Sequence, residues 1–266
     1  VDVAVLTAQQ KNYTLTFSTE GTTIEDRRAG GAGTDTLIDI EQLRFSTNPT
    51  SNPNVGILFD LTIFDGVLDA SPEQLETLTL LYMALYDRAP DALGLYYWAT
   101  YMSAGLDIDI ITQAFIDSPE AIQIYGAAPT AAEIVEKAYE NVLQRTPDPA
   151  GAQFWTSLIE QEVITPAEYF ALFAEGVQNN PGAGDDRQTL ADQTDIGLYF
   201  SAIMGLSNAN DATAAMATYD ATDREQSLTT AQNLIDNFLY EALSTGPSGE
   251  FIVPLVGIVE DPFALG

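Results

Sequence analysis

Much of the chain carries apolar residues at the spacing of a helix. Four apolar residues near position 80 lie at i, i+3, i+4 and i+7, which is the apolar face of an amphipathic helix. The same spacing returns further along the chain. We therefore predict two equivalent helices, one with Leu78, Leu81, Tyr82 and Leu85 on its apolar face, the other with Val135, Ala138, Tyr139 and Val142.

These two helices open a unit that the sequence contains twice. Residues 78–98 and 135–155 align without a gap, and both tryptophans of the chain fall on one position of the alignment. Such a coincidence indicates a duplicated structural unit. The paired identities are Tyr82/Tyr139, Arg88/Arg145, Pro90/Pro147, Asp91/Asp148, Gly94/Gly151 and Trp98/Trp155.

The shared residues predict a helix–turn–helix. The residue before each proline, Ala89 or Thr146, is driven out of the helical region, so the first helix should end there. The proline then fits the first turn of the next helix. We interpret the remaining identities as structural: the arginine reaches the last carbonyls and the aspartate, the glycine admits another backbone, and the tryptophan is buried. A ligand-binding role for the two tryptophans is the alternative. The structural candidates are Arg88, Asp91, Gly94, Trp98, Arg145, Asp148, Gly151 and Trp155.

Capping signals predict the other helices of a region that spans residues 69–244, with repeats at 78–126 and 135–180. Capping boxes stand at Thr130/Glu133 and Thr165/Glu168, and Ser118-Pro119-Glu120 starts a short helix. Residues 179–186 are predicted to form a loop. The further predicted helices cover 106–116, 163–174, 187–206, 209–219 and 224–244.

The first fifty residues have a different period. Tyr13, Leu15 and Phe17 alternate with polar residues, and after a turn at Glu20-Gly21 the chain returns, so residues 1–50 predict a β-hairpin and a further strand at 42–45. Residues 51–68 are expected to be a linker and the entry to the helical region. Residues 245–266 are expected to be an extended tail. The predicted fold is mainly α with a small N-terminal β element.

Composition and charge narrow the function. The chain has 266 residues, 46% of them apolar, and a formal net charge of −30. Nucleic-acid binding is excluded because phosphate contacts need Lys and Arg. The absence of His removes the commonest general base and metal ligand. No apolar run is long enough for a membrane span. No signal peptide is visible, and the chain opens in what resembles the middle of a strand, so we expect a fragment or a processed product.

A glycine-rich stretch suggests Ca²⁺ binding. Residues 30–38, GGAGTDTLI, fit the nonapeptide G-G-x-G-x-D-x-U-x of Ca²⁺-binding β-rolls at every position. The glycines would turn carbonyls toward the ion and the aspartate would add a carboxylate. A glycine-rich turn that binds no ion is the alternative. The candidate Ca²⁺ ligands are Asp26, Gly31, Gly33, Asp35, Asp39 and Glu41, with Asp185 and Asp186 as weaker candidates.

Two resemblances cover residues 1 to about 240. Residues 13–46 resemble the segment that closes RTX β-rolls in bacterial type I-secreted proteins. The helical part resembles a domain of unknown function common in the same proteins, through Leu81-Tyr82, Arg88-Ala89-Pro90-Asp91, Gly94 to Trp98, Phe115 to Glu120 and Thr194 to Phe200. The second copy departs from this pattern, because Ala174-Glu175-Gly176 stands where Ser-Pro-Glu is expected.

The resemblance implies secretion to the cell exterior, with relatives among surface-layer proteins and adhesins, and it fixes no enzymatic activity. We expect a non-enzymatic, Ca²⁺-dependent surface module for attachment or assembly, whose partner is a second copy or a cell-surface polysaccharide. The apolar tail would then be a type I secretion signal, or alternatively a last docked strand. A related helical region in one surface-layer group is linked to attachment to lipopolysaccharide.

Two other functions stay open. A carbohydrate- or lipopolysaccharide-binding domain could stack sugars on Tyr96, Tyr97, Trp98 and Tyr101. The chain could also be the non-catalytic C-terminal part of a larger secreted enzyme. A hydrolase that uses two carboxylates cannot be recognised among 39 acidic residues, and no nucleophile elbow, zinc motif or phosphate loop is present.

Overall fold

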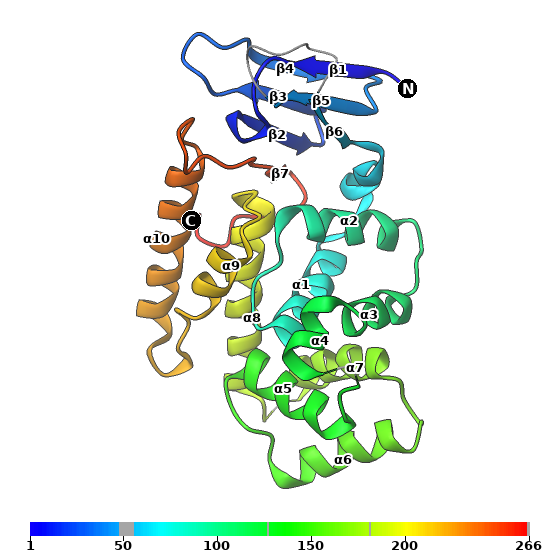
Figure 1. Cartoon of the computed structure of the whole chain (residues 1–266). Coiled ribbons are helices and arrows are strands. Elements are labelled where there is room, and N and C mark those ends of the chain that lie inside the picture. Colours follow the sequence, from blue (N-terminus) through cyan, green and yellow to red (C-terminus); the bar gives the residue numbers. More distant parts are fainter. Residues whose placement is uncertain (48–55, 127, 181, 265–266) are drawn as a thin grey trace.

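The computed structural model describes residues 1–47, 56–126, 128–180 and 182–264. Strands gather at one end of the molecule and helices form the rest (Figure 1). The fold is mainly α with a small β element, as predicted. One continuous apolar core joins the two parts, because strand residues such as Leu15 and Phe45 belong to the same buried cluster as the helical residues.

The β element consists of two small sheets. One has the strand order β1-β5-β6, with β1 and β5 parallel, and the other has the order β4-β3-β2-β7, with β2 and β7 parallel. The predicted hairpin is the antiparallel pair of β2 and β3. The strands are β1 (Val3–Leu6), β2 (Tyr13–Ser18), β3 (Thr22–Asp26), β4 (Gly33–Leu37), β5 (Gln42–Ser46), β6 (Gly56–Asp60) and β7 (Leu255–Val256).

The β element extends further along the chain than predicted. Residues 56–60, which we expected to lead into the helical region, form β6 and pair antiparallel with β5. A short apolar run does not distinguish a strand from a helix by its period, and pairing with β5 decides the outcome here. Two short 3₁₀ turns, Thr62–Phe64 and Val67–Asp69, then lead into the first long helix. Of the expected linker, residues 51–55 lie outside the described residues.

The C-terminal tail is docked, which agrees with the alternative of a last docked strand. It returns to the β element as β7, beside Phe17 and Ser18 of β2, and Figure 1 shows it between the strands and the helices. Ile252, Val253 and Leu255 are almost fully buried. The Arg27 guanidinium links both ends of the chain, because it donates to the carbonyls of Tyr13 and Glu250 at 2.8 and 2.6 Å.

The helices follow the capping signals. The predicted capping boxes at Thr130 and Thr165 are present, and a further box forms at Ser71. In each, the cap side chain accepts from the backbone N–H three residues later, and the side chain of that residue accepts from the cap backbone N–H. The helices are α1 (Pro72–Tyr86), α2 (Ala92–Ser103), α3 (Ile108–Ile116), α4 (Pro119–Tyr125), α5 (Ala131–Leu143), α6 (Pro149–Glu160), α7 (Pro166–Asn179), α8 (Gly184–Leu198), a π-helical turn (Tyr199–Ile203), α9 (Ala209–Met216) and α10 (Arg224–Ala242).

The first helix of each repeat ends earlier than the proline rule suggests. α1 ends at Tyr86 and α5 at Leu143, and the residues that follow, Asp87 and Gln144, adopt the left-handed conformation with φ of 53° and 51°. A left-handed residue after the last turn terminates a helix by itself. The repeat prolines therefore stand before the next helix rather than in its first turn, and the repeat aspartates, Asp91 and Asp148, are its N-caps.

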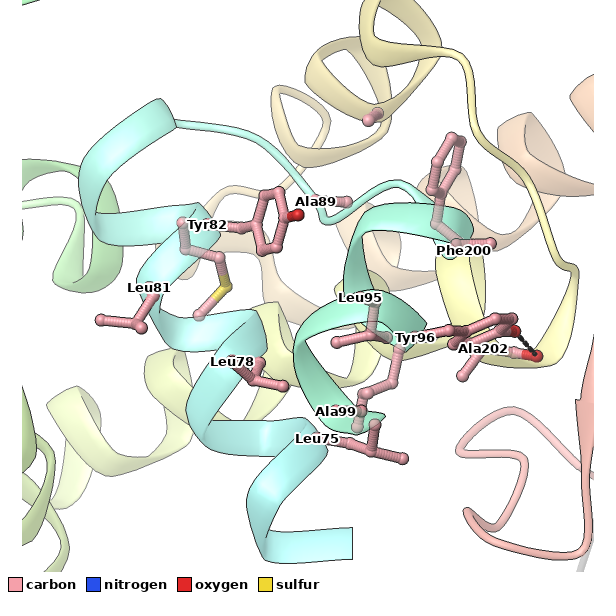
Figure 2. Close-up of a cluster of buried hydrophobic side chains, with 14 of the residues drawn as sticks. Leu75, Leu78, Leu81, Tyr82, Ala89, Leu95, Tyr96, Ala99, Phe200 and Ala202 are labelled. Atoms are coloured by element: carbon pink, nitrogen blue, oxygen red, sulfur yellow. Dashed lines mark hydrogen bonds between the residues drawn. The ribbon is translucent and has the colours of Figure 1, made fainter. Parts of the chain in front are cut away.

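The core between α1 and α2 positions the tail. Leu75 and Leu78 of α1 face Leu95 and Ala99 of α2 in Figure 2. Tyr96 of α2 is fully buried, and its hydroxyl lies against the carbonyls of Ser201, Ala202 and Val253, at 3.2, 3.3 and 2.7 Å. The π-helical turn and the tail thus share one hydrogen-bond donor in the centre of the molecule.

Candidate functional site

The arginine of the first repeat is enclosed between helices. The Arg88 guanidinium stacks on the Tyr82 ring at 5.0 Å and donates two hydrogen bonds to Glu120 of α4, at 2.6 and 2.9 Å. It also donates to the carbonyl of Ala89 and lies 3.6 Å from Asp91. Burial disfavours its charge, but the bonds and charge of Glu120 outweigh burial, so the pKa of Arg88 is raised above its ordinary value. Arg88 joins three helices.

The repeat glycine makes room for a tyrosine hydroxyl, which corrects the prediction that it admits another backbone. A Cβ on Gly94 would lie 2.4 Å from the Tyr82 hydroxyl, and a Cβ on Gly151 would lie 3.2 Å from the Tyr139 hydroxyl. The second repeat also stacks its arginine, Arg145, on the tyrosine ring at 5.0 Å. Both repeats therefore contain the same assembly of Tyr, Arg, Asp and Gly.

The second arginine binds a different partner. Arg145 donates two hydrogen bonds to Asp186 in the first turn of α8, at 2.7 and 2.6 Å. Asp185 and Asp186, which we assigned to a loop and offered as weaker Ca²⁺ ligands, lie in a helix that begins at Gly184. The Arg145 side chain is 39% exposed, whereas that of Arg88 is 7% exposed. The second repeat is the open one.

A difference in the third helix of the unit explains this opening. In the first repeat α3 ends at Ile116 and α4 folds back, with Tyr125 donating to the carbonyl of Ala84 in α1. In the second repeat α7 continues to Asn179. When Phe115 and Phe173 are aligned, Gly176-Val177-Gln178 occupies the position of Ser-Pro-Glu, two residues later than we had aligned it. Without the proline the helix continues and no equivalent of α4 covers Arg145.

The uncovered space is a cavity of about 200 Å³, which we call the Trp155 pocket. Its walls come from the end of α5, the start of α6, the second half of α7 and the start of α8. The lining residues combine aromatic rings with charged and amide groups: Tyr139, Leu143, Arg145, Asp148, Trp155, Phe173, Gly176, Val177, Asn180, Ala183 and Asp186.

Both tryptophans are half-buried, which corrects the prediction that they are buried. Trp98 packs on Phe115 at 5.7 Å, and Trp155 packs on Tyr169 at 5.3 Å, so one face of each indole contacts the core. Trp155 and Arg145 line one cavity, as expected of a tryptophan near the arginine of its repeat.

Three of the candidate Ca²⁺ ligands, Asp26, Gly33 and Asp35, line one cavity of about 90 Å³, whereas Asp39 and Glu41 line another. Asp26 is buried and binds Arg28 through two hydrogen bonds of 2.9 and 2.6 Å, which lower the pKa of Asp26 to about 2. Gly31 packs on this carboxylate, because a Cβ there would lie 2.5 Å from it. Gly33, with a φ of 83°, opens β4, and Asp35 follows it on the same strand.

The other candidates point elsewhere. Asp39 and Glu41 line a separate cavity of about 330 Å³ with Asp65, and Glu41 accepts a hydrogen bond from the backbone of Asp2. Among the described residues, no group of three or more His, Cys, Asp or Glu side chains is placed to hold a metal ion. Asp35 is exposed, and within the same residues no hydrogen bond or ion pair holds its carboxylate. The residues fit a Ca²⁺ site only in part.

The four aromatic residues offered for sugar stacking separate into two groups. Tyr96 is fully buried and serves the core. Tyr97 and Tyr101 pack against each other at 4.8 Å and Tyr97 packs on Trp98 at 5.0 Å, with Tyr101 39% exposed. These three form a partly exposed aromatic edge on α2.

Sequence reasoning missed the acidic partners of the arginines. Glu120 was predicted only to start a helix, and Asp186 only to lie in a loop as a weaker candidate Ca²⁺ ligand. A third ion pair joins Arg224 of α10 to Asp192 of α8, whose side chain is 1% exposed and also accepts from the Tyr219 hydroxyl at 2.8 Å. The composition gave a hint of these pairs. With only nine Lys and Arg against 39 acidic residues, an arginine within a helical repeat is expected to have an acidic partner.

Asp195 of α8 gives a pH-dependent prediction. Burial first, and then the charges of Asp192 and Glu76, raise the pKa of Asp195 to about 6. Between pH 4 and 6 the folded state then binds more protons than the unfolded state, so this group lowers the free energy of unfolding as pH rises. We expect Asp195→Asn to stabilise the protein at pH 7 by about 1–2 kcal/mol, after allowance for solvent screening.

The measurement is chemical denaturation of both proteins from pH 4 to pH 7. The two stabilities should converge toward pH 4, where Asp195 is protonated in the folded wild type. A constant difference at all pH values would assign the effect of the substitution to packing instead of charge.

The comparisons with known proteins identify one family model. A family described as "Domain of unknown function (DUF4214)" matches residues 112–180, from within α3 to the end of α7 and its following residue. This stretch contains the second repeat and all lining residues of the Trp155 pocket except Ala183 and Asp186. No curated protein and no solved structure matches the chain. In the described part of the chain, no helix is long and apolar enough to cross a membrane.

Proposed function

We propose that this chain is a non-catalytic attachment module of a secreted cell-surface protein, and that Ca²⁺ stabilises its folded state. The observation that best supports the proposal is the position of the β-roll nonapeptide. β4, which carries it, is the edge strand of its sheet, and all its residues but Leu37 are exposed. A strand in this place can be continued by a further β-roll turn, which is how such repeats complete their ion sites.

The charge distribution supports the role of Ca²⁺. The chain has 39 acidic residues and nine basic ones, and several of the basic residues are already engaged by Asp26, Glu120, Asp186 and Asp192. The remaining carboxylates repel one another in the compact state. A divalent cation relieves this repulsion, and extracellular Ca²⁺ modules bind at roughly 10⁻⁴–10⁻³ M.

We expect Ca²⁺ to raise the melting temperature, with Asp35 as one ligand. An ion that binds only the folded state adds roughly 2.7 kcal/mol at a hundredfold excess over its Kd. Wild type and Asp35→Asn should be melted in Ca²⁺ and in chelator at one fixed ionic strength, so that general screening is constant. The substituted protein should lose most of the gain.

Asp109 offers a matched control, because it is also an acidic residue in a short element and its replacement by Asn leaves β4 unchanged. Asp109→Asn should keep the full gain from Ca²⁺. An equal gain in all three proteins would mean that the ion acts diffusely, and no gain in any of them would remove Ca²⁺ from the proposal.

The helical region supports attachment to a cell-surface polysaccharide, because the Trp155 pocket combines aromatic rings with polar groups. Self-association of the chain and a place at the end of a larger secreted enzyme remain proposals that rest on the resemblance of residues 13–46 to RTX closing segments.

A further inference from the structure

We propose that the Trp155 pocket binds a single unit of a neutral polysaccharide, an inference that rests on the proposed attachment function. The pocket measures about 200 Å³, which is below the roughly 300–1,000 Å³ of sites for drug-sized ligands. It therefore suits one ring of a chain molecule whose neighbouring units stay outside. When several copies of the protein bind one polysaccharide, many weak contacts of this kind add up to a higher overall avidity.

The walls of the pocket match the two kinds of surface on a pyranose. One face of a sugar ring carries C–H groups and packs on aromatic rings, and here the half-buried Trp155 offers the accessible ring, with Tyr139 and Phe173 buried in the wall. Its hydroxyl groups donate to carboxylates and accept from amides and guanidinium groups. Asn180 and Asp186 supply such groups at the other wall.

The charge of the pocket selects against acidic sugars. Arg145 is the only cation in the lining, and its charge is already balanced by the two hydrogen bonds to Asp186. Asp148 adds a second carboxylate, so the lining has a net negative charge in a chain whose net charge is −30. A carboxylate or sulfate on the sugar would be repelled, whereas a neutral ring meets no such penalty.

The first repeat shows that this opening is not required for the fold of the unit. It contains the same Tyr, Arg, Asp, Gly and Trp, but there α4 covers the arginine and supplies Glu120. The second repeat keeps these residues with the arginine 39% exposed. The chain therefore carries a closed version of its own site, which serves as an internal control.

The two tryptophans make the test direct. Trp98→Phe leaves Trp155 as the only indole, and Trp155→Phe leaves Trp98. Each variant is titrated with neutral oligosaccharides of glucose, galactose and mannose, and with oligogalacturonate as the acidic probe, while tryptophan emission is recorded. We expect a saturable change at millimolar or lower concentration in the Trp98→Phe protein with at least one neutral probe, and none with oligogalacturonate.

A second pair of variants separates binding from folding. An added Cβ at Gly176, which lines the pocket, meets nothing within 4 Å, and the same holds at Gly184, which is not in the lining. Gly176→Leu should fill the pocket and weaken binding at least tenfold without lowering the melting temperature, because Gly is the poorer helix former. Gly184→Leu should bind as the wild type does.

No emission change with any neutral probe, or unchanged binding by Gly176→Leu, would overturn the pocket assignment. A stronger response to oligogalacturonate would overturn the selection for neutral sugars. These outcomes differ from failure of the proposed function, since the response of the melting temperature to Ca²⁺ and Asp35→Asn does not involve this pocket.

Discussion

Replacing Arg88 by Ala should lower the free energy of unfolding by about 3–4 kcal/mol. Removal of one member of a buried ion pair costs about this much, because the site loses its bonds and keeps a desolvated partner. Arg88 would lose two bonds to Glu120, the bond to the Ala89 carbonyl and its stacking on Tyr82. Since Glu120 is 41% exposed, water relieves part of its charge, which places the cost at the lower end of the range for buried pairs.

The second repeat supplies the matched variant. Arg145→Ala should cost only about 1 kcal/mol, because an ion pair with a well-exposed arginine contributes little. Urea denaturation of both variants, with unchanged slopes, measures the two losses on one scale. Equal losses would mean that α4 does not make the first repeat more stable than the second, and the closed-versus-open comparison would fail.

Removal of residues 251–266 should abolish cooperative folding. This deletion takes away Ile252, Val253 and Leu255, each almost fully buried, and burial of such a side chain is worth roughly 1.5–3 kcal/mol. It also leaves the Tyr96 hydroxyl without its shortest bond, 2.7 Å to the Val253 carbonyl. The combined loss approaches the roughly 5–15 kcal/mol that hold a protein folded.

Near-ultraviolet circular dichroism and thermal melting report the result. The control deletion removes only residues 264–266, which keeps β7 and the contact of Phe263 with Tyr199, and should melt within a few degrees of the full chain. If the protein without residues 251–266 melts as cooperatively as the control, the docked tail is dispensable and can be treated as an independent segment.

Local patterns predicted most of the fold. Helices were placed to within a few residues because capping residues and apolar spacing agree at the same positions, as at Thr165 with Glu168. β6 was not recognised because a short apolar run can form a strand or a helix, and its pairing with β5 decides the outcome. A docked strand was only the alternative for the tail, because β7 depends on a strand far away in the sequence. β7 has only two residues, and its pairing with Phe17 and Ser18 cannot be inferred from its own composition.

The candidate site was only half predictable for a related reason. The repeat identified Arg145, Asp148, Gly151 and Trp155 by alignment alone. The missing Ser-Pro-Glu step was visible too, but its consequence depends on where α7 ends and which residue replaces Glu120. Asp186, which lies in the next helix, replaces Glu120 as the partner of the arginine, and no pattern within the repeat indicates it.

The contacts between the two ends of the chain also set an order of folding. Lys11 donates to the carbonyl of Gly246 across 235 positions, and Arg27 to that of Glu250 across 223. Contacts so distant in sequence are slow to form, because closing the long loop between them costs chain entropy before the contact offsets it. As the polypeptide emerges from the ribosome, the hairpin of β2 and β3 can form early but must wait for the last segment. Until then the apolar side of β2 is exposed and can pair with wrong partners. The helical domain is the long loop that must close before β2 is covered.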